Sequence, residues 1–392
     1  MAAQAQVRLT LEDAIRQALS SNPQLDAAEG RVDQTRAERI QAGLGPNPRV
    51  VTQTEDVRFW GTQNHNFANT TEDYLYFGQV IEAGGKRGRR VDLASSTIRS
   101  SELQRDLLTR QLRGRVSAAY WTAAGSAKMR DLLRENLQTY EEDANYIRNR
   151  VREGVMAEAD LMRVEVERDR VRVQSLTAAR DADVAVVELY RAMGRNDFPP
   201  TDLVDPLDSR RAVILPEVQT VLSSRPEARV ARERIAEAEA NVSLQRANAK
   251  PDPEVFGGYK RVSGLDTLFA AVQIDIPVRN RNQGNIASSL AQVRIARSNL
   301  AFTESSIRAE LESAERAYQD EQGLVELLPS TLDKARESER LARAAYREGA
   351  IDLIRLLDAE RNRIDIQAQY YRALVDLQQS IVNLTLAAGE MK

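Results

Sequence analysis

Side chains able to catalyse a reaction are few in this sequence. It contains no cysteine and one histidine, His65, which excludes a cysteine nucleophile, a thiolate zinc site and a multi-histidine metal site. Serine and threonine hydroxyls therefore have a single histidine base available. The 58 acidic residues form many carboxylate pairs by chance, with arginine nearby. We expect no catalytic residue, no metal site and no cofactor, and we predict that the protein is not an enzyme.

The segment Gly84-Gly85-Lys86-Arg87-Gly88 is the nearest approach to a phosphate-binding loop. It lacks the G-x-x-x-x-G-K-[ST] spacing, and no serine or threonine follows the lysine. Its glycines are better explained by a turn from a strand into a helix, where their conformational freedom is needed. His65 lies between two asparagines, a pattern typical of a solvated loop.

Composition restricts the class of protein. The chain has 392 residues, of which 42% are hydrophobic and 29% charged, so it is neither disordered nor a bundle of membrane helices. A net charge of −3 argues against nucleic-acid binding. The stretch Ala3-Gln4-Ala5 is typical of the end of a removed secretory signal, and a short disordered start is the alternative.

Long helices must position whatever residues carry the function. No proline occurs between Arg49 and Phe198, and only Pro329 follows Val278. From Ile286 to Tyr346, fourteen of the eighteen positions spaced alternately four and three apart are apolar, which predicts a sustained heptad seam. The seam keeps its phase across Pro329, so this proline should kink the helix rather than end it.

The chain repeats itself at an interval of about 200 residues, which indicates a tandem duplication. Three pairs of short matches carry this inference: Leu19-Ser20-Ser21-Asn22-Pro23 with Leu222-Ser223-Ser224-Arg225-Pro226, Pro46-Asn47-Pro48 with Pro251-Asp252-Pro253, and Arg152-Glu153-Gly154 with Arg347-Glu348-Gly349.

Each repeat contains a segment of strand-like character. Thr267–Ile276 alternates apolar and polar residues, and Tyr74-Leu75-Tyr76-Phe77 is rich in β-formers. Each segment predicts a hairpin, with loops near Trp60–Asn69 and Ser263–Asp266. Outer-membrane barrels need at least about eight strands, so a chain with four must supply part of a shared barrel.

This plan resembles the TolC-type outer membrane factors over nearly the whole chain. Glu82-Ala83-Gly84-Gly85-Lys86-Arg87-Gly88 and Pro277-Val278-Arg279-Asn280-Arg281-Asn282-Gln283-Gly284 are similar to the strand-to-helix turns of the branch that serves cobalt–zinc–cadmium efflux. The resemblance implies a mainly α protein with a β-barrel portion. Its protomer is a duplicated helix–β-hairpin–helix unit, and its homotrimer forms a 12-stranded outer-membrane β-barrel continued by a 12-helix periplasmic α-barrel. The family's N-terminal lipid-anchoring cysteine is not in this sequence.

The expected organisation is two structural repeats joined by a linker in an equatorial belt, with these ranges: first repeat 1–195, with helix 8–44, hairpin 49–82, long helix 86–151, tip turn 152–157 and helix 158–194; linker 196–214; second repeat 215–392, with helix 215–249, hairpin 254–278, long helix 284–347, tip turn 348–352 and helix 353–388.

The resemblance also implies partners and sites. The protein would be a passive exit duct in the bacterial outer membrane, working with a periplasmic adaptor and an inner-membrane RND transporter, with heavy-metal cations as the favoured cargo. The residues expected to dock the adaptor are Gly154, Val155, Met156, Gly349, Ala350 and Ile351.

The pore constriction is expected at charged residues that follow the two tip glycines. In the family's second repeat, acidic residues six and nine positions after the glycine can line the pore; Asp358 matches and Arg355 departs from this pattern. The first repeat has Asp160 and Arg163 at the same offsets, so Asp160 could pair with Arg355 and Arg163 with Asp358. A solvated charged face is the alternative.

Two other functions stay open at this point. One is a soluble coiled-coil scaffold, which the heptads alone would satisfy but the aromatic hairpins would not. The other is an outer-membrane duct for drug efflux or type I protein secretion, because such a tunnel would pass these cargoes equally well.

Overall fold

The computed structural model describes residues 7–57, 70–209 and 213–389. They form two compact units, each built from separate stretches of the chain. The first unit comprises Met1–Ala27, Arg105–Arg225 and Glu304–Lys392, and the second comprises Ala28–Gln104 and Pro226–Thr303. His65 and the expected loop near Trp60–Asn69 lie outside the described residues.

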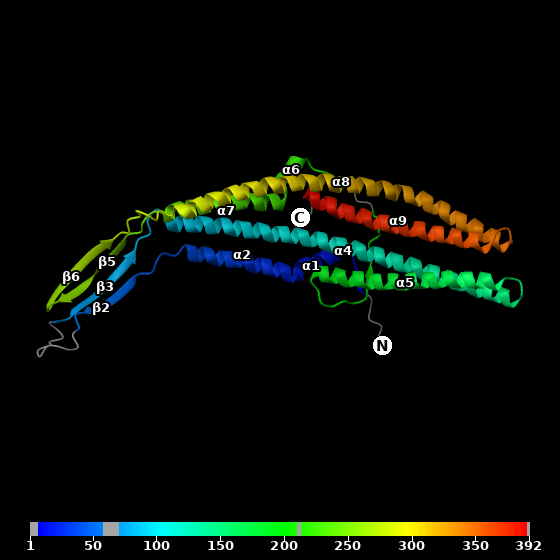
Figure 1. The fold of residues 1–392 in the computed structure, drawn as a ribbon, viewed down its shortest axis with the longest axis horizontal. Helices are drawn as coiled ribbons and strands as arrows, with labels where there is room; N and C mark the ends of the chain where they lie inside the picture. The colour runs from blue at the N-terminus through cyan, green and yellow to red at the C-terminus, as the bar shows by residue number, and fades with distance from the viewer. Residues whose placement is uncertain (1–6, 58–69, 210–212, 390–392) are drawn as a thin grey trace. The chain divides into compact units, whose positions relative to one another are not determined.

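The second unit contains a four-stranded antiparallel sheet in the order β2-β3-β5-β6 (Figure 1). Its strands are β2 (Arg49–Glu55), β3 (Glu72–Val80), β5 (Glu254–Val262) and β6 (Leu265–Gln273). The hairpins expected from the alternating residues are therefore present, and the two pair with each other through β3 and β5.

Glycines allow this sheet to form at two points. Ser263 and Gly264 connect β5 to β6 with φ angles of 51° and 79°, the left-handed conformation that a tight two-residue hairpin turn requires. Gly258 lies opposite Tyr76, and a Cβ atom at Gly258 would lie 2.3 Å from the carbonyl oxygen of Leu75. A side chain at position 258 would therefore force β3 and β5 apart.

The strand-to-helix junction of the second unit is held by charged pairs. Asp252 accepts hydrogen bonds from the backbone N–H of Ala83 and from Nζ of Lys86, at 2.8 and 2.7 Å. Arg90 forms an ion pair with Glu82. Lys86 is buried, so the glycine-rich segment is a structural turn that ties the two hairpins together.

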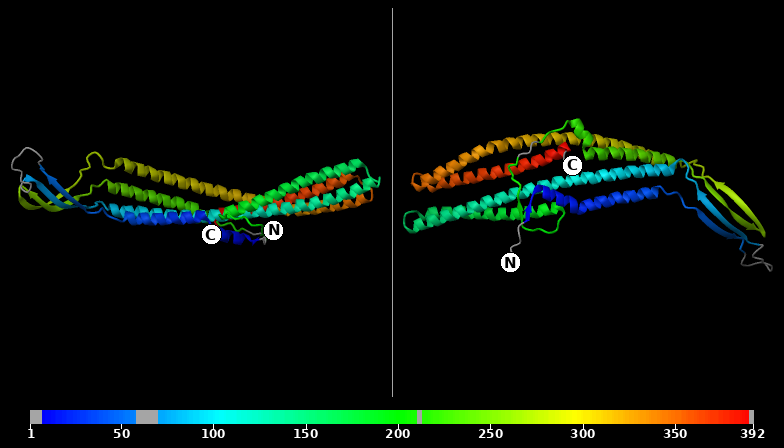
Figure 2. Two further views of the ribbon diagram at one scale, coloured as in Figure 1. Left: turned by 90° about the horizontal axis from the view of Figure 1, so that it is seen from below. Right: turned by 180° about the vertical axis from the view of Figure 1, so that it is seen from behind.

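The first unit contains these helices: α1 (Leu11–Ser21), α5 (Glu158–Met193), α6 (Val218–Ser224), α9 (Leu353–Ala388), and parts of α2 (Pro23–Ala42), α4 (Lys86–Arg152) and α8 (Gln283–Arg347). The turns between α4 and α5 and between α8 and α9 make each pair antiparallel (Figure 2). Helix α8 runs through Pro329 without ending, in agreement with the continuous seam.

A short parallel pairing lies beside the core of the first unit. Strand β1 (Val7–Leu9) pairs with β4 (Thr201–Leu203). The hydroxyl of the fully buried Tyr120 donates to a carboxylate oxygen of Asp205 at 2.6 Å, which ties α4 to the segment after β4. Arg8 and Leu9 are therefore in a strand and not in the expected helix 8–44, and the expected linker 196–214 contains a strand that pairs with them.

Two expected helices are each divided in the structure. The segment 8–44 contains α1 and α2 (Pro23–Ala42), and the segment 215–249 contains α6 and α7 (Pro226–Asn248). Asn22 and Arg225 adopt extended backbone at the breaks. The cause is the proline that follows each of them, because a residue before proline is pushed out of the helical region and proline itself suits the first helical position.

The duplication keeps a constant interval through the α4–α5 and α8–α9 pairs. Gly154 and Gly349 end α4 and α8, and Gly194 and Gly389 end α5 and α9, all four with φ between 75° and 82°. Each glycine of the second repeat is numbered 195 higher than its counterpart. The two helical hairpins thus share one register without insertions.

Candidate functional site at the helical turns

The two tip turns have the same backbone hydrogen bonds. At the first, the N–H of Val155 donates to the carbonyl of Arg150 at 3.0 Å and that of Gly154 to Val151 at 2.9 Å. At the second, Ala350 donates to Ala345 and Gly349 to Tyr346, at 2.8 and 3.0 Å. This is the Schellman arrangement, in which glycine takes the left-handed position after the helix.

The apolar residues of the turns divide into exposed and packed ones. Val155 and Ala350 are exposed, whereas Met156 and Ile351 are half-buried. The sulfur of Met156 lies 4.0 Å from the hydroxyl of Tyr346, which ties the first turn to α8. Each turn therefore presents one apolar side chain to solvent on a backbone fixed by its cap.

The expected constriction residues lie on α5 and α9, just after the turns. Arg163 and Asp358 line one pocket of about 390 Å³, together with Met162, Val166 and Ile354. Asp358 forms an ion pair with Arg361 at 3.4 Å. In the described part of this chain no ion pair joins Arg163 to Asp358, so the structure brings these two residues to one pocket without direct pairing.

Asp160 and Arg355 are likewise not joined by an ion pair within the chain as described. The backbone N–H of Arg355 donates to Asp352, the N-cap of α9, at 3.0 Å, and its side chain is exposed. Burial, together with the negative charge of Asp160, raises the pKa of Tyr346 to about 12. Asp160 thus affects α8 electrostatically.

A buried group of charged residues, which sequence analysis did not identify, lies where α4, α5, α8 and α9 meet. Arg343 of α8 lies 3.3 Å from Asp143 of α4, 2.5 Å from Glu360 of α9 and 3.6 Å from Glu339. Arg363 lies 2.6 Å from Glu339. Two guanidinium groups therefore connect three helices through three carboxylates.

Electrostatics in this group favour a bound proton. Burial and the negative charges of Asp143 and Glu339 together raise the pKa of Glu360 to about 7, against the opposing effect of Arg343. Burial also raises the pKa of Asp143. The hydroxyl of Tyr140 beside these groups has no hydrogen-bond partner among the described residues.

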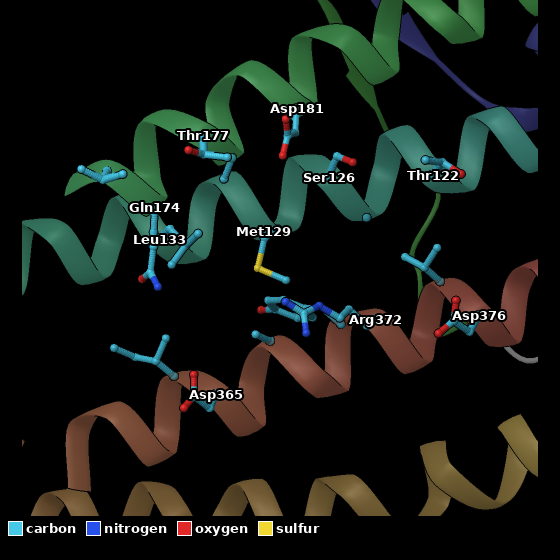
Figure 3. A pocket seen from close by; sticks show the side chains of 17 residues that line it. Thr122, Ser126, Met129, Leu133, Gln174, Thr177, Asp181, Asp365, Arg372 and Asp376 are labelled. Atoms are coloured by element: carbon cyan, nitrogen blue, oxygen red, sulfur yellow. The ribbon is translucent and has the colours of Figure 1, made fainter. Parts of the chain in front are cut away.

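Helices α5 and α9 form with α4 a wider groove of about 630 Å³ further from the turns. Figure 3 shows Arg372 extending from α9 toward Met129 of α4, with Asp365 and Asp376 on the same face of α9. The groove is lined by polar and apolar groups without a nucleophile–base pair, because no histidine or cysteine contributes to it.

In the part of the chain that the structure describes, no group of three or more histidine, cysteine, aspartate or glutamate side chains is placed to hold a metal ion. None of the described helices has the length and apolar character needed to cross a membrane.

Solved structures share this fold. The Campylobacter jejuni CmeC outer membrane channel superposes with a TM-score of 0.84 at 15% identity, covering 97% of this chain and 85% of that one. The protomer of that channel therefore has the fold described above, with the four-stranded sheet and the twin helical turns.

The family follows from the sequence. The model of the outer membrane efflux protein family matches residues 14–195 and 218–390, and the chain belongs to this family. The two matched segments coincide with the two halves of the duplication. Membership in a family of efflux channels agrees with the prediction that the protein is not an enzyme.

Curated relatives are named for different substances. The cobalt-zinc-cadmium resistance protein CzcC of Cupriavidus metallidurans is 24% identical over 385 residues, covering 97% of this chain and 90% of that protein. The toluene efflux pump outer membrane protein TtgC of Pseudomonas putida is 26% identical over 412 residues, covering 97% of this chain and 82% of that protein.

Proposed function

We propose that three copies of this chain form the outer-membrane exit duct of a tripartite pump. The observation that carries this proposal is the sheet with unpaired edges. Strands β2 and β6 are the outer members of a four-stranded sheet, and β6 exposes Leu268 and Val272. Open edges with apolar faces are unfavourable in water and in lipid, and pairing β6 of one copy with β2 of the next removes both edges. Three copies then close a barrel of twelve strands.

The cargo proposed for this duct is a heavy-metal cation. Support comes from the likeness to CzcC and to the nickel-cobalt-cadmium resistance protein NccC of Alcaligenes xylosoxydans xylosoxydans, which is 23% identical over 306 residues. The likeness to TtgC makes an organic cargo the second candidate. The chain is a conduit in either case, with the adaptor and the RND transporter supplying selection and energy.

The tip turns are proposed as the adaptor-docking surface and the charged residues after them as the gate. Val155 and Ala350 supply exposed apolar contacts for a helical hairpin of the adaptor. Three copies of Asp358 would place an acidic ring at the tunnel end, which favours cations. Asp160 with Arg355, and Arg163 with Asp358, are candidate holding pairs between neighbouring copies.

Expression in a strain that lacks its own duct tests the proposal. Outer-membrane fractions should contain a heat-modifiable trimer, and the strain carrying the cognate adaptor and transporter should regain resistance to cobalt, zinc or cadmium. Restored resistance to toluene alone would favour the organic cargo. A protein recovered only as a soluble monomer would contradict the duct itself.

A further inference from the structure

Two rows of apolar side chains are exposed on the single chain. On α5 they include Val173 and Leu176, which are 64% and 67% exposed. On α8 they include Leu324 and Leu327, which are 46% and 64% exposed. Spacings of three residues place each pair on one helical face, so each helix presents an apolar strip that another surface should cover.

Within the chain, the packing of α4 against α9 has a simple register. The residue numbers of contacting partners add up to between 499 and 501, as expected for two antiparallel helices without insertions. Four contacts define this register: Gly125 with Val375, Gly114 with Leu386, Thr122 with Gln379, and Asn136 with Arg363.

The duplication relates this packing to the two exposed rows. Helix α8 is the counterpart of α4 and α5 is the counterpart of α9, each displaced by 195 residues. Burial follows the same correspondence. Four pairs of buried counterparts show it: Leu112 and Ile307, Val116 and Leu311, Ala178 and Ala373, and Leu189 and Leu384. The face of α4 that packs against α9 should therefore have an equivalent face on α8, and α5 should pack against that face.

The same register can be applied to α8 and α5. A residue of α8 is numbered 195 higher than its counterpart in α4, and a residue of α5 is numbered 195 lower than its counterpart in α9, so the sum of the two residue numbers is unchanged. The rule then places Leu327 opposite Val173 and Leu324 opposite Leu176. These are members of the two exposed rows, although the rule was obtained from α4 and α9 without reference to exposure.

Charge agrees with the same register. The positions that correspond to Gly125 and Val375 are Asp320 of α8 and Arg180 of α5, both of which are exposed. The register therefore places two opposite charges where the α4–α9 packing has a close glycine contact. Leu132, the counterpart of Leu327, is 3% exposed, so this position of the repeat is buried wherever a partner helix is present.

We propose that α8 of one copy packs antiparallel against α5 of a second copy, with Leu327 on Val173, Leu324 on Leu176 and Asp320 on Arg180. This inference rests on the assembly proposed above and specifies its helical interface and register. The two surfaces of a copy differ, so the contact is head-to-tail, and the three-copy assembly proposed above requires it to close into a ring. The copy-to-copy packing then reproduces the packing between the repeats.

Cysteine crosslinking tests the register cleanly because the chain has no native cysteine. Two chains with tags of different size are co-expressed, one carrying Leu327→Cys and the other Val173→Cys, and treated with a short bismaleimide. We expect a mixed crosslinked dimer. The matched control replaces Val173→Cys by Val166→Cys, also exposed but about 10 Å further along α5, and should give little product.

Charge reversal gives an independent test. Arg180→Asp should weaken each copy-to-copy contact by about two- to five-fold, as expected for an exposed ion pair, and lower the fraction of assembled protein in mild detergent. Asp320→Arg should have the same effect, and the double variant should recover assembly. Light scattering after size-exclusion chromatography measures this fraction.

The outcomes separate this inference from the proposed function. An intact trimer that crosslinks through Val166→Cys, or through neither cysteine pair, would overturn the register and leave the duct standing. Failure of the double charge variant to recover assembly, with both single variants impaired, would also overturn it. An unmodified chain that remains a monomer in detergent and in membranes would overturn the duct and the interface together.

Discussion

The guanidinium of Arg343 lies 2.5 Å from a carboxylate oxygen of Glu360, a side chain that is only 3% exposed. The counterpart of this pair in the first repeat is Arg148 with Glu165, at 2.7 Å and partly exposed. The same contact thus occurs once in a buried setting and once near the surface. Because Glu360 is buried between the repeats, the ion pair of Arg343 with Glu360 is the one that is sensitive to protonation.

The first prediction concerns pH. Glu360 holds a proton up to about pH 7 in the folded chain, whereas an unfolded chain releases it near its ordinary pKa of about 4.3. Between these values the folded state binds more protons, so its stability falls as the pH rises, by up to about 3 kcal/mol for this group. The thermal midpoint of the helical circular dichroism signal should therefore be higher at pH 5.5 than at pH 8.

Glu360→Gln is the variant that isolates this effect. It retains the shape and cannot ionise, so the difference in midpoint between pH 5.5 and pH 8 should shrink. Glu165→Gln, the counterpart on the partly exposed pair, should leave the difference as in the parent protein. An unaltered pH dependence in Glu360→Gln would show that other groups cause it.

The second prediction concerns the close approach of α4 and α9. A Cβ atom at Gly125 would lie 2.1 Å from Cγ2 of Val375, so Gly125→Ala should destabilise the protein by about 1–3 kcal/mol. Additional Val375→Ala should recover most of this loss. Gly30→Ala serves as the control, because the space there is open, and it should stabilise α2 by about 0.5–1 kcal/mol. Denaturation midpoints measure all three variants.

The third prediction concerns ion selection at the tunnel end. Asp358→Asn removes a charge without changing shape, so reconstituted channels should lose cation preference in a planar bilayer. Arg355→Ser should raise the open probability if Arg355 holds the gate. Reversal potentials and single-channel records measure the two effects. If both are unaltered, these residues form a solvated charged face.

The fourth prediction concerns the adaptor. A photo-reactive amino acid at Val155 or Ile351 should capture the adaptor, and Val155→Asp should abolish restored metal resistance while leaving the trimer intact. Glu153→Ala, on the same exposed turn, should keep resistance. Capture only from Leu265, at the hairpin turn of the sheet, would contradict docking at the helical turns.

Turn chemistry explains why much of the fold could be predicted. Gly154 and Gly349 end helices through the same cap, and the alternation around Leu268 and Val272 specifies a strand. Such local signals can be recognised in a single sequence. The parallel pairing of β1 with β4 left no comparable signal, because it joins two three-residue segments about 190 positions apart.

The buried charged group was missed for a related reason. Arg343 on α8 and Arg363 on α9 look like surface arginines, and only the packing of α4, α8 and α9 removes Glu360, the partner of Arg343, from solvent. One signal was present: Glu339 is one of the four charged positions in the heptad seam. A charged residue at a seam position requires a partner of opposite charge, and Arg343 and Arg363 supply it.

Pro329 gives the two longest helices unequal bending stiffness. Proline has no amide hydrogen, so the carbonyl of Val325 lacks its usual partner in the helical ladder of α8. The corresponding position in α4 is Arg134, which retains its amide hydrogen. A force applied at the Gly349 turn would be absorbed partly by flexure near Pro329, whereas the same force at the Gly154 turn would travel along an uninterrupted rod.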